Sequence, residues 1–311
     1  KVSQNVYSKN TLNYACTLHS LYRPLYRNHI PVVMKQFEKL SPIQEIESNI
    51  SVIFGILRNQ NIPSKEYSLI LLLLSIYKDG LLGEDILKER NQQKSKLIDH
   101  LNSVSDGQYT DILEHFIPSL SRFSENGIGE VFEILRRIDI SVLSANFPAI
   151  FENVLYRISH YQGRQFGEFI QPVELTRLMC TLAELEPNAR VFNPFAGLAS
   201  FEAYLDQSHE YVGQELNPQT WALGALRLMA YKKLVTSKYM NEDSVTNWPV
   251  ETGTLFSKPK EEFNLIISTP PFESTLGFSY NGNRTLEQYL IERGINSLGQ
   301  NSKLITLLPH R

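Results

Sequence analysis

The stretch RVFNPFAGLASFEAYLDQSHEYVGQE, residues 190–215, decides the fold. It predicts a short strand at 190–192, a turn around Gly197, a helix at about 200–206 and a second strand that ends at Glu215. In doubly wound parallel sheets such a turn holds a nucleotide, and such an acidic residue binds the hydroxyls of its ribose. The turn lacks GxGxxG spacing, so a cofactor with one ribose and no phosphate fits better than a dinucleotide. The alternative interpretation of Glu215 is a solvated strand end.

Strands and helices continue to alternate downstream, as expected for βαβ units. A long helix is predicted at 218–233, and further strands at 263–267 (FNLII) and 303–308 (KLITLL). The last strand lies so close to Arg311 that we expect the sheet to continue beyond the sequence given. Residues 159–311 are therefore expected to form an α/β domain, cut short at its C-terminal end, that carries the chemistry.

The residues before this domain follow a different pattern. From about 41 to 158 the apolar residues recur at helical spacing. The string Ser41-Pro42-Ile43-Gln44 is typical of a helix start, whereas Asp79-Gly80 and Asn126-Gly127 are typical of helix ends. We expect residues 1–158 to form an all-helical domain that serves packing and the docking of a partner protein.

Composition excludes several classes of protein. The chain has 311 residues, of which 42% are hydrophobic and 20% charged, which is enough for globular domains with real cores. Its longest apolar stretch, YSLILLLLSIY at 67–77, is short of the roughly 20 residues that cross a bilayer and predicts a buried helix. Cys16 and Cys180 lack CxxC spacing, so we expect no metal, no disulfide framework and a cytoplasmic location. With a net charge of −3, a nucleic-acid binder of this composition would have to concentrate its basic residues on one face or borrow basic surface from a partner.

A second candidate site follows the predicted strand at 263–267, in the string Thr269-Pro270-Pro271-Phe272. Two prolines stiffen a turn and present carbonyl oxygens without neighbouring N–H groups, and an aromatic ring at the tip can stack on a flat group. The pattern therefore predicts a binding site for a flat ligand. The alternative is an ordinary strand end, with Thr269 as a cap and Phe272 in the core.

Several short strings, taken in order, resemble the motifs of one family. They are Gly167-Glu168-Phe169-Ile170-Gln171-Pro172, Asn193-Pro194-Phe195-Ala196-Gly197-Leu198-Ala199-Ser200, Gly213-Gln214-Glu215, Glu242-Asp243-Ser244 and Thr269-Pro270-Pro271-Phe272. Together they resemble the N6-adenine DNA methyltransferases, in particular the modification subunit of type I restriction-modification systems. The resemblance implies a Rossmann-like, doubly wound methyltransferase sheet preceded by an all-helical N-terminal domain.

The resemblance also implies a cofactor, a substrate and partners. The cofactor would be S-adenosylmethionine, and the substrate double-stranded DNA with a flipped adenine that is methylated at N6. The partners would be a sequence-specificity subunit and a restriction or translocase subunit, with no membrane involved. In that family the residue at the position of Thr269 and the Pro270 carbonyl accept the two amine hydrogens, while the ring of Phe272 stacks on the base. The residues expected to hold the cofactor are Glu168, Phe169, Ile170, Gln171, Pro172, Asn193, Gly197, Leu198, Ala199, Glu215 and Asp243.

The sequence departs from the family pattern at functional positions. Thr269 stands where the family has Asn, Asp or Ser, and Gln171 stands where it has Thr. Asn193 removes a carboxylate from the surroundings of the sulfonium, and Leu198 and Ser200 are expected to crowd the closest backbone approach to the cofactor. Three functions stay open. They are adenine methylation, a degenerate methyltransferase that holds cofactor or DNA as a scaffold, and methyl transfer to amide or amino groups of protein or RNA.

Overall fold

The computed structural model describes residues 40–83, 86–87, 93–103, 109–162, 170–249, 263–271 and 285–308. The chain divides into two compact units, residues 1–44 and 45–311, and only residues 40–44 of the first are described. All strands described below belong to the second unit. The helices belong to it as well, except for residues 42–44 at the start of the first helix. The expected domain boundary between residues 158 and 159 stays a prediction.

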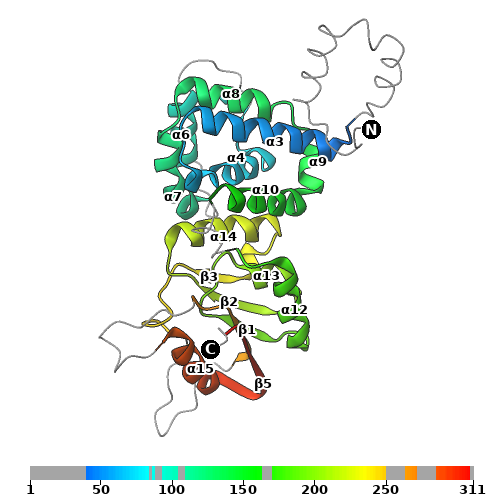
Figure 1. The fold of residues 1–311 in the computed structure, drawn as a ribbon, viewed down its shortest axis with the longest axis vertical. Coiled ribbons are helices and arrows are strands. Elements are labelled where there is room, and N and C mark those ends of the chain that lie inside the picture. The colour runs from blue at the N-terminus through cyan, green and yellow to red at the C-terminus, as the bar shows by residue number, and fades with distance from the viewer. Residues whose placement is uncertain are drawn as a thin grey trace, which may run out of the picture. The chain divides into compact units, whose positions relative to one another are not determined.

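Every regular element described before Val173 is a helix (Figure 1). The predicted start of the first helix is confirmed, because Ser41 N donates to Gln44 Oε1 at 2.9 Å and Gln44 N donates to Ser41 Oγ at 3.3 Å. The elements are α3 (Pro42–Asn59), the 3₁₀ helix η1 (Ser64–Glu66), α4 (Leu69–Lys78), α6 (Gln93–Ser103), α7 (Thr110–Ser121), α8 (Glu125–Leu135), α9 (Ile140–Ala145) and α10 (Phe147–Gln162).

Helix α4 lies at the centre of this helical part. Its residues from Leu69 to Tyr77 are all buried, because a helix that is apolar on every side has to be surrounded by other elements. Helices α7, α9 and α10 pack around it. The predicted helix end is also confirmed, since α4 stops before Asp79 and Gly80 has a left-handed φ of +71°. Within the described ranges, no helix combines the length and apolarity that a membrane span requires.

The predicted helix end at Asn126-Gly127 is wrong. Both residues lie in the first turn of α8, where the N-cap residue Ser124 accepts a hydrogen bond from Gly127 N at 3.0 Å. A Cβ on Gly127 would lie 2.6 Å from the side chain of Gln60, just beyond the end of α3. The glycine therefore permits close packing of two helices and does not end one.

Downstream of the helices, the described chain forms one sheet of five parallel strands (Figure 1). The strands are β1 (Arg190–Asn193), β2 (Glu210–Gln214), β3 (Lys238–Met240), β4 (Phe263–Ser268) and β5 (Leu298–Thr306), in the spatial order β3-β2-β1-β4-β5. The strand order reverses between β1 and β4. Open parallel sheets bind their ligands beyond the carboxyl ends of the strands at such a switch point.

Helices cover both faces of this sheet. Helices α12 (Val173–Ala183) and α13 (Ser200–Tyr204) share one core cluster with Val191 and Leu265. Helix α15 (Leu286–Ser297) contributes Leu290 to another cluster, which contains Phe192 and Ile266. Successive strand residues point to opposite faces, which explains why neighbours on β1 and on β4 belong to different clusters.

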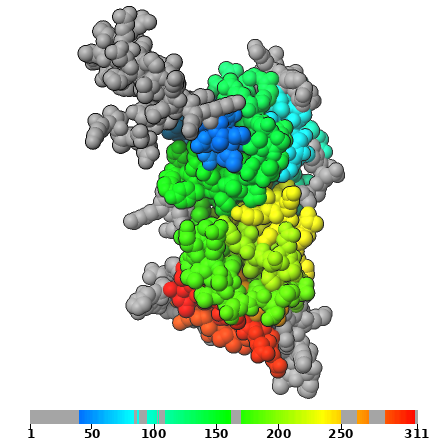
Figure 2. Space-filling model, turned by 90° about the vertical axis from the view of Figure 1, so that its right-hand side faces the viewer, coloured from blue at the N-terminus to red at the C-terminus, as the bar shows by residue number. Residues whose placement is uncertain are grey.

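Helix α14 (Pro218–Ala230) joins the sheet to the preceding helices. It contacts α13 on one side and α4, α7 and α10 on the other. Its buried Leu223 and Leu226 belong to the same hydrophobic cluster as the side chains of α4 and α10. The space-filling view shows the two parts in direct contact (Figure 2). They therefore share one continuous core.

Two strands differ from the sequence predictions. The sequence does not predict strand β3, because three residues are too few to show a period-two pattern. The last strand, predicted at 303–308, spans Leu298–Thr306. Its first half contains the polar residues Gln300 to Ser302, and β5 lies at the edge of the sheet, where a strand does not need to be apolar. The other predicted strands and helices of this half lie close to where the sequence places them.

Candidate active site

The candidate site lies at the carboxyl edge of the sheet, around the switch point between β1 and β4. Strand β1 ends at Asn193 and β4 ends at Ser268, and the pairing of Phe192 with Ile266 places these ends side by side. Strand β2 ends on the other side of β1, just before Glu215. The sheet thus brings together the glycine turn, the acidic strand end and the Thr-Pro-Pro tip.

The turn after β1 has two residues with left-handed backbone. Gly197 has a φ of +54° and Ala199 a φ of +51°, a conformation that costs a residue with a Cβ roughly 1–2 kcal/mol. The turn is tied to β2 by Ala196 N, which donates to Gln214 O at 2.8 Å. A Cβ built on Gly197 would meet no atom within 4 Å. The turn is therefore open on the side where a ligand would approach its backbone.

Glu215 holds the same turn through its carboxylate. Its Oε2 accepts a hydrogen bond from Gly197 N at 2.9 Å, and its Oε1 accepts one from Asn217 N at 2.8 Å. Burial raises the pKa of Glu215, and the N–H groups of Asn217 and Gly197 oppose that rise. The carboxylate is thus part of the turn and not a solvated strand end. It offers about four lone-pair sites, so each oxygen keeps the capacity to accept a further hydroxyl.

Two other predicted residues order the neighbouring loops. Asn193 is buried, and its Oδ1 accepts from Phe195 N at 3.3 Å, so an amide orders the start of the turn. Asp243 Oδ1 accepts from the backbone N–H two residues downstream at 2.9 Å. The Ser244 hydroxyl donates to Pro194 O, which places the loop that contains Asp243 against the turn after β1.

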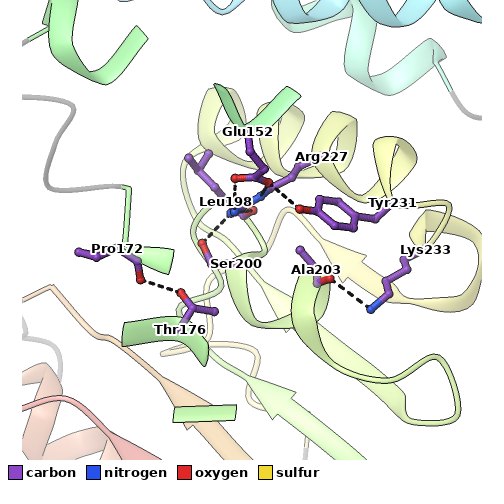
Figure 3. A network of polar contacts seen from close by, with 9 residues as sticks. All are labelled: Glu152, Pro172, Thr176, Leu198, Ser200, Ala203, Arg227, Tyr231 and Lys233. Carbon is purple, nitrogen blue, oxygen red and sulfur yellow. Dashed lines mark hydrogen bonds and ion pairs between the residues drawn. The ribbon is translucent and has the colours of Figure 1, made fainter. Parts of the chain in front are cut away.

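A buried arginine on α14 ties the glycine turn to helix α10 (Figure 3). Arg227 donates to the two carboxylate oxygens of Glu152 at 2.6 and 2.8 Å. Its Nη1 also donates to Leu198 O at 3.3 Å and to Ser200 Oγ at 2.8 Å. The Tyr231 hydroxyl donates to Glu152 at 3.2 Å. Arg227 therefore fixes the second half of the turn with respect to the helical part of the chain.

The sequence predictions missed Arg227 and Glu152, although a signal for the arginine exists. It is the charged residue in the otherwise apolar string WALGALRLMA, and a buried charge requires a partner. The network also shows the positions of Leu198 and Ser200, which the sequence predicts to crowd the backbone approach to the cofactor. Leu198 is buried in the core shared with the helices, and Ser200 is held by Arg227, so neither side chain occupies the open side at Gly197.

The Thr-Pro-Pro tip meets the segment that precedes α12. Thr269 Oγ1 donates to Gln171 Oε1 at 3.1 Å across 98 positions of sequence. Gln171 Nε2 in turn contacts the Sδ atom of Met179 on α12 at 3.7 Å. Pro270 is buried next to Thr269, and Pro172 is the N-cap residue of α12.

The remaining predicted site residues are Ile170, which the structure describes, and three residues outside the described ranges. Ile170 packs partly buried against the core of the helical part. In the part of the chain that the structure covers, no three His, Cys, Asp or Glu side chains gather as metal ligands would. The predicted site residues Glu168, Phe169 and Phe272 lie outside the described residues.

Comparison with known proteins identifies the family. Residues 144–298, from the end of α9 to the first residue of β5, match the family model described as N-6 DNA Methylase. This segment belongs to the N-6 DNA methylase family. The matched segment contains the glycine turn, Glu215, Arg227 and the Thr-Pro-Pro tip, and it confirms the resemblance drawn from the sequence motifs.

Two solved structures share the fold over most of the chain. One is the methyltransferase subunit of a type I restriction-modification system from Streptococcus thermophilus, with 12% identity and a TM-score of 0.59, over 85% of this chain and 75% of that one. The other is a modification subunit assigned to a type I restriction enzyme from Vibrio vulnificus YJ016, with 12% identity and a TM-score of 0.55, over 88% and 72%. They confirm the expected α/β methyltransferase fold preceded by helices. Comparison with curated proteins gives no match.

Proposed function

We propose that this chain transfers a methyl group from S-adenosylmethionine to N6 of adenine in DNA, as the modification subunit of a type I-like restriction-modification system. The observation that carries the proposal is the arrangement at the switch point, where the Thr269-Pro270 tip, held by Gln171, lies on the strand next to the open turn at Gly197. Membership of the N-6 DNA methylase family supports the reaction class. The fold shared with two type I subunits supports the assembly.

The residues around the turn fit S-adenosylmethionine. The open side at Gly197 allows a ligand to approach the backbone, and Glu215 keeps lone pairs for the hydroxyls of one ribose. When bound, S-adenosylmethionine supplies a methyl group activated by its sulfonium. We expect the cofactor to be held by Ile170, Gln171, Pro172, Asn193, Gly197, Leu198, Ala199, Glu215 and Asp243, together with Glu168 and Phe169.

The tip suits an exocyclic amine. Conjugation with the adenine ring withdraws the lone pair of N6, and two acceptors that each take one amine hydrogen make that lone pair available. Thr269 Oγ1 and the Pro270 carbonyl have these roles in the proposal, and residue 271 is a proline, so no N–H at that position competes for the base. Phe272 would stack on the flipped base. After methyl transfer the nitrogen loses one proton to water.

The low net charge of the chain supports a partner subunit that contacts the DNA. A net charge of −3 is low for a protein that grips DNA by itself, and a subunit that leaves target reading to a partner needs less basic surface. We therefore propose that the helices up to Gln162 dock a sequence-specificity subunit. We also propose that a restriction or translocase subunit joins the assembly and that the complex acts on DNA in the cytoplasm.

The function can be tested directly. The protein is mixed with its specificity subunit, unmethylated DNA and isotope-labelled S-adenosylmethionine, and the hydrolysed DNA is examined by mass spectrometry for N6-methyladenine. The control is the same mixture without the specificity subunit. If the complete mixture forms no more labelled N6-methyladenine than this control, adenine methylation in this assembly is contradicted. Label in protein or RNA would support transfer to those substrates instead. Absence of calorimetric S-adenosylmethionine binding at millimolar concentration would exclude both the enzyme and a cofactor-holding scaffold.

A binding scaffold without chemistry is the second candidate function. It is favoured by Thr269, whose side chain is shorter than that of the Asn found at this position in the resembling family. The substitution Thr269→Asn separates the two functions. A large gain from no activity would support a degenerate site, whereas a loss of activity would show that Thr269 is part of a working one.

A further inference from the structure

We infer that Gln171 is a positioning residue, which holds the Thr269 hydroxyl as a hydrogen-bond acceptor for the amine that is methylated. The inference rests on the proposed function and adds a residue to it. Gln171 stands in a segment that the family resemblance relates to the cofactor, but in this structure its amide contacts the Thr-Pro-Pro tip.

The geometry determines which end of the Gln171 amide faces Thr269. The amide nitrogen lies 3.7 Å from Met179 Sδ, and sulfur in a thioether accepts hydrogen bonds but cannot donate them. The amide oxygen therefore faces Thr269 Oγ1, at 3.1 Å. An amide oxygen only accepts, so the Thr269 hydroxyl is the donor in this contact. Met179 is buried on α12, which gives the amide a fixed neighbour.

The direction of this hydrogen bond matters for chemistry. A hydroxyl has one proton and two lone pairs, so a free threonine could either accept from an amine hydrogen or donate to the amine nitrogen. Donation to the nitrogen would occupy the lone pair that has to attack the methyl group. When Gln171 Oε1 takes the proton, only the lone pairs of Thr269 are left for the amine. The pair thus gives threonine the acceptor-only behaviour that an asparagine oxygen has without help.

The orientation of this bond predicts a specific pattern of variants. Gln171→Met keeps the length of the side chain and removes the acceptor, so we expect kcat to fall by roughly 10- to 100-fold. The KM for DNA and the Kd for S-adenosylmethionine should stay within about two-fold, because the residue acts through Thr269. Gln171→Glu keeps an acceptor oxygen for the Thr269 hydroxyl and should retain more activity than Gln171→Met. In a Thr269→Asn background, Gln171→Met should change the activity that remains by less than about two-fold, because asparagine needs no acceptor for a proton.

A measurement without cofactor or DNA tests the contact itself. Gln171→Met and Thr269→Val each remove the same hydrogen bond, so each should lower Tm by about 2–4 °C, and the double variant should lower it no further than the more damaging single one. Additive shifts would show that the two side chains are not coupled. This measurement also establishes that each variant used for kinetics is folded.

The outcomes separate the inference from the function on which it rests. A wild-type protein that forms no N6-methyladenine would refute the proposed function. An active wild type with an unimpaired Gln171→Met variant would refute only the role of Gln171. A rise in the Kd for S-adenosylmethionine that matches the loss of kcat would overturn that role too, since Gln171 would then be a cofactor contact. The role is also refuted if Gln171→Met is equally damaging with asparagine at position 269.

Discussion

The buried ion pair between Glu152 and Arg227 joins helix α10 to the glycine turn, and its two partners are unequally exposed. The side chain of Arg227 is 3% exposed and that of Glu152 is 22% exposed. Removing one partner of a buried pair leaves the other charge uncompensated, which costs about 3–5 kcal/mol. We predict that loss of the more exposed partner is the more damaging, because the charge left behind is then the one that water cannot reach.

The magnitudes follow from the contacts that each variant keeps. Glu152→Gln preserves one acceptor oxygen, and Arg227 keeps its bonds to Leu198 O and Ser200 Oγ, so the loss should lie at the lower end, about 3 kcal/mol. Arg227→Met fills the same space with an apolar chain and leaves Glu152 with solvent and the Tyr231 hydroxyl, so we expect about 2 kcal/mol. The double variant should be about as stable as Arg227→Met, because the charge that water cannot reach, that of Arg227, is absent from both and the remaining Glu152 carboxylate is in contact with solvent.

Urea unfolding measures these differences, with the fluorescence of the two tryptophans as the probe, one of which, Trp221, lies on the same helix. Glu130→Gln on the exposed side of α8 is the matched control and should change the free energy of unfolding by less than about 0.5 kcal/mol. The reasoning is refuted if Arg227→Met is the more damaging single change. It is also refuted if the double variant loses the sum of the two single effects.

Three further predictions concern the turn and a buried carboxyl group. Gly197→Ala places a Cβ in the open side of the turn at a φ of +54°. It should weaken S-adenosylmethionine binding, measured by calorimetry, and lower the free energy of unfolding by roughly 1–2 kcal/mol. The control Gly55→Ala in α3 should raise the free energy of unfolding by about 0.5–1 kcal/mol without affecting binding. Equal affinities in both variants would contradict this role of the turn. Gly224→Ala would bring a Cβ within 2.3 Å of the Tyr239 hydroxyl, which donates to Gly197 O in the glycine turn. The Tm should therefore fall by several degrees. An unchanged Tm would show that the tyrosine can move freely. Burial raises the pKa of Glu202 from 4.5 to about 7, so the folded state binds more protons than the unfolded state and stability should fall as pH rises through this window. The urea midpoints at pH 5 and at pH 7.5 should therefore differ less in Glu202→Gln than in the wild type. An identical difference in both proteins would exclude this carboxyl as the cause.

Local sequence signals are sufficient for the frame of the site. The strand, glycine turn and acidic strand end between residues 190 and 215 are each encoded within a few neighbouring residues, and the structure has them in place. The contact of Gln171 with Thr269 is different, because it depends on the pairing of β1 with β4 and on the packing of α12. No local pattern relates two segments so far apart.

The errors have a similar physical origin. Asn126-Gly127 predicts a helix end because Asn-Gly commonly forms turns, whereas the absent Cβ of Gly127 is used for the approach of Gln60. The charge of Arg227 indicates that a partner exists but not that the partner is Glu152, which lies 75 positions earlier. In each case the residue type is informative, and the tertiary contact that explains it comes from elements that are remote in sequence.

The contacts of the unusual residues bear on the choice between enzyme and scaffold. A polar group that is buried without a partner costs about 1–3 kcal/mol, so a hydroxyl at position 269 requires a partner, whereas valine would fill the same space without one. Thr269 instead has a dedicated acceptor in Gln171, and Ser200 has a dedicated donor in Arg227. A site with such specific partners for its departures is better explained by a requirement for the Thr269 oxygen than by drift. The two functions therefore differ for Thr269→Val. A scaffold would keep its affinity for S-adenosylmethionine and DNA, whereas the enzyme would keep both affinities and lose methylation.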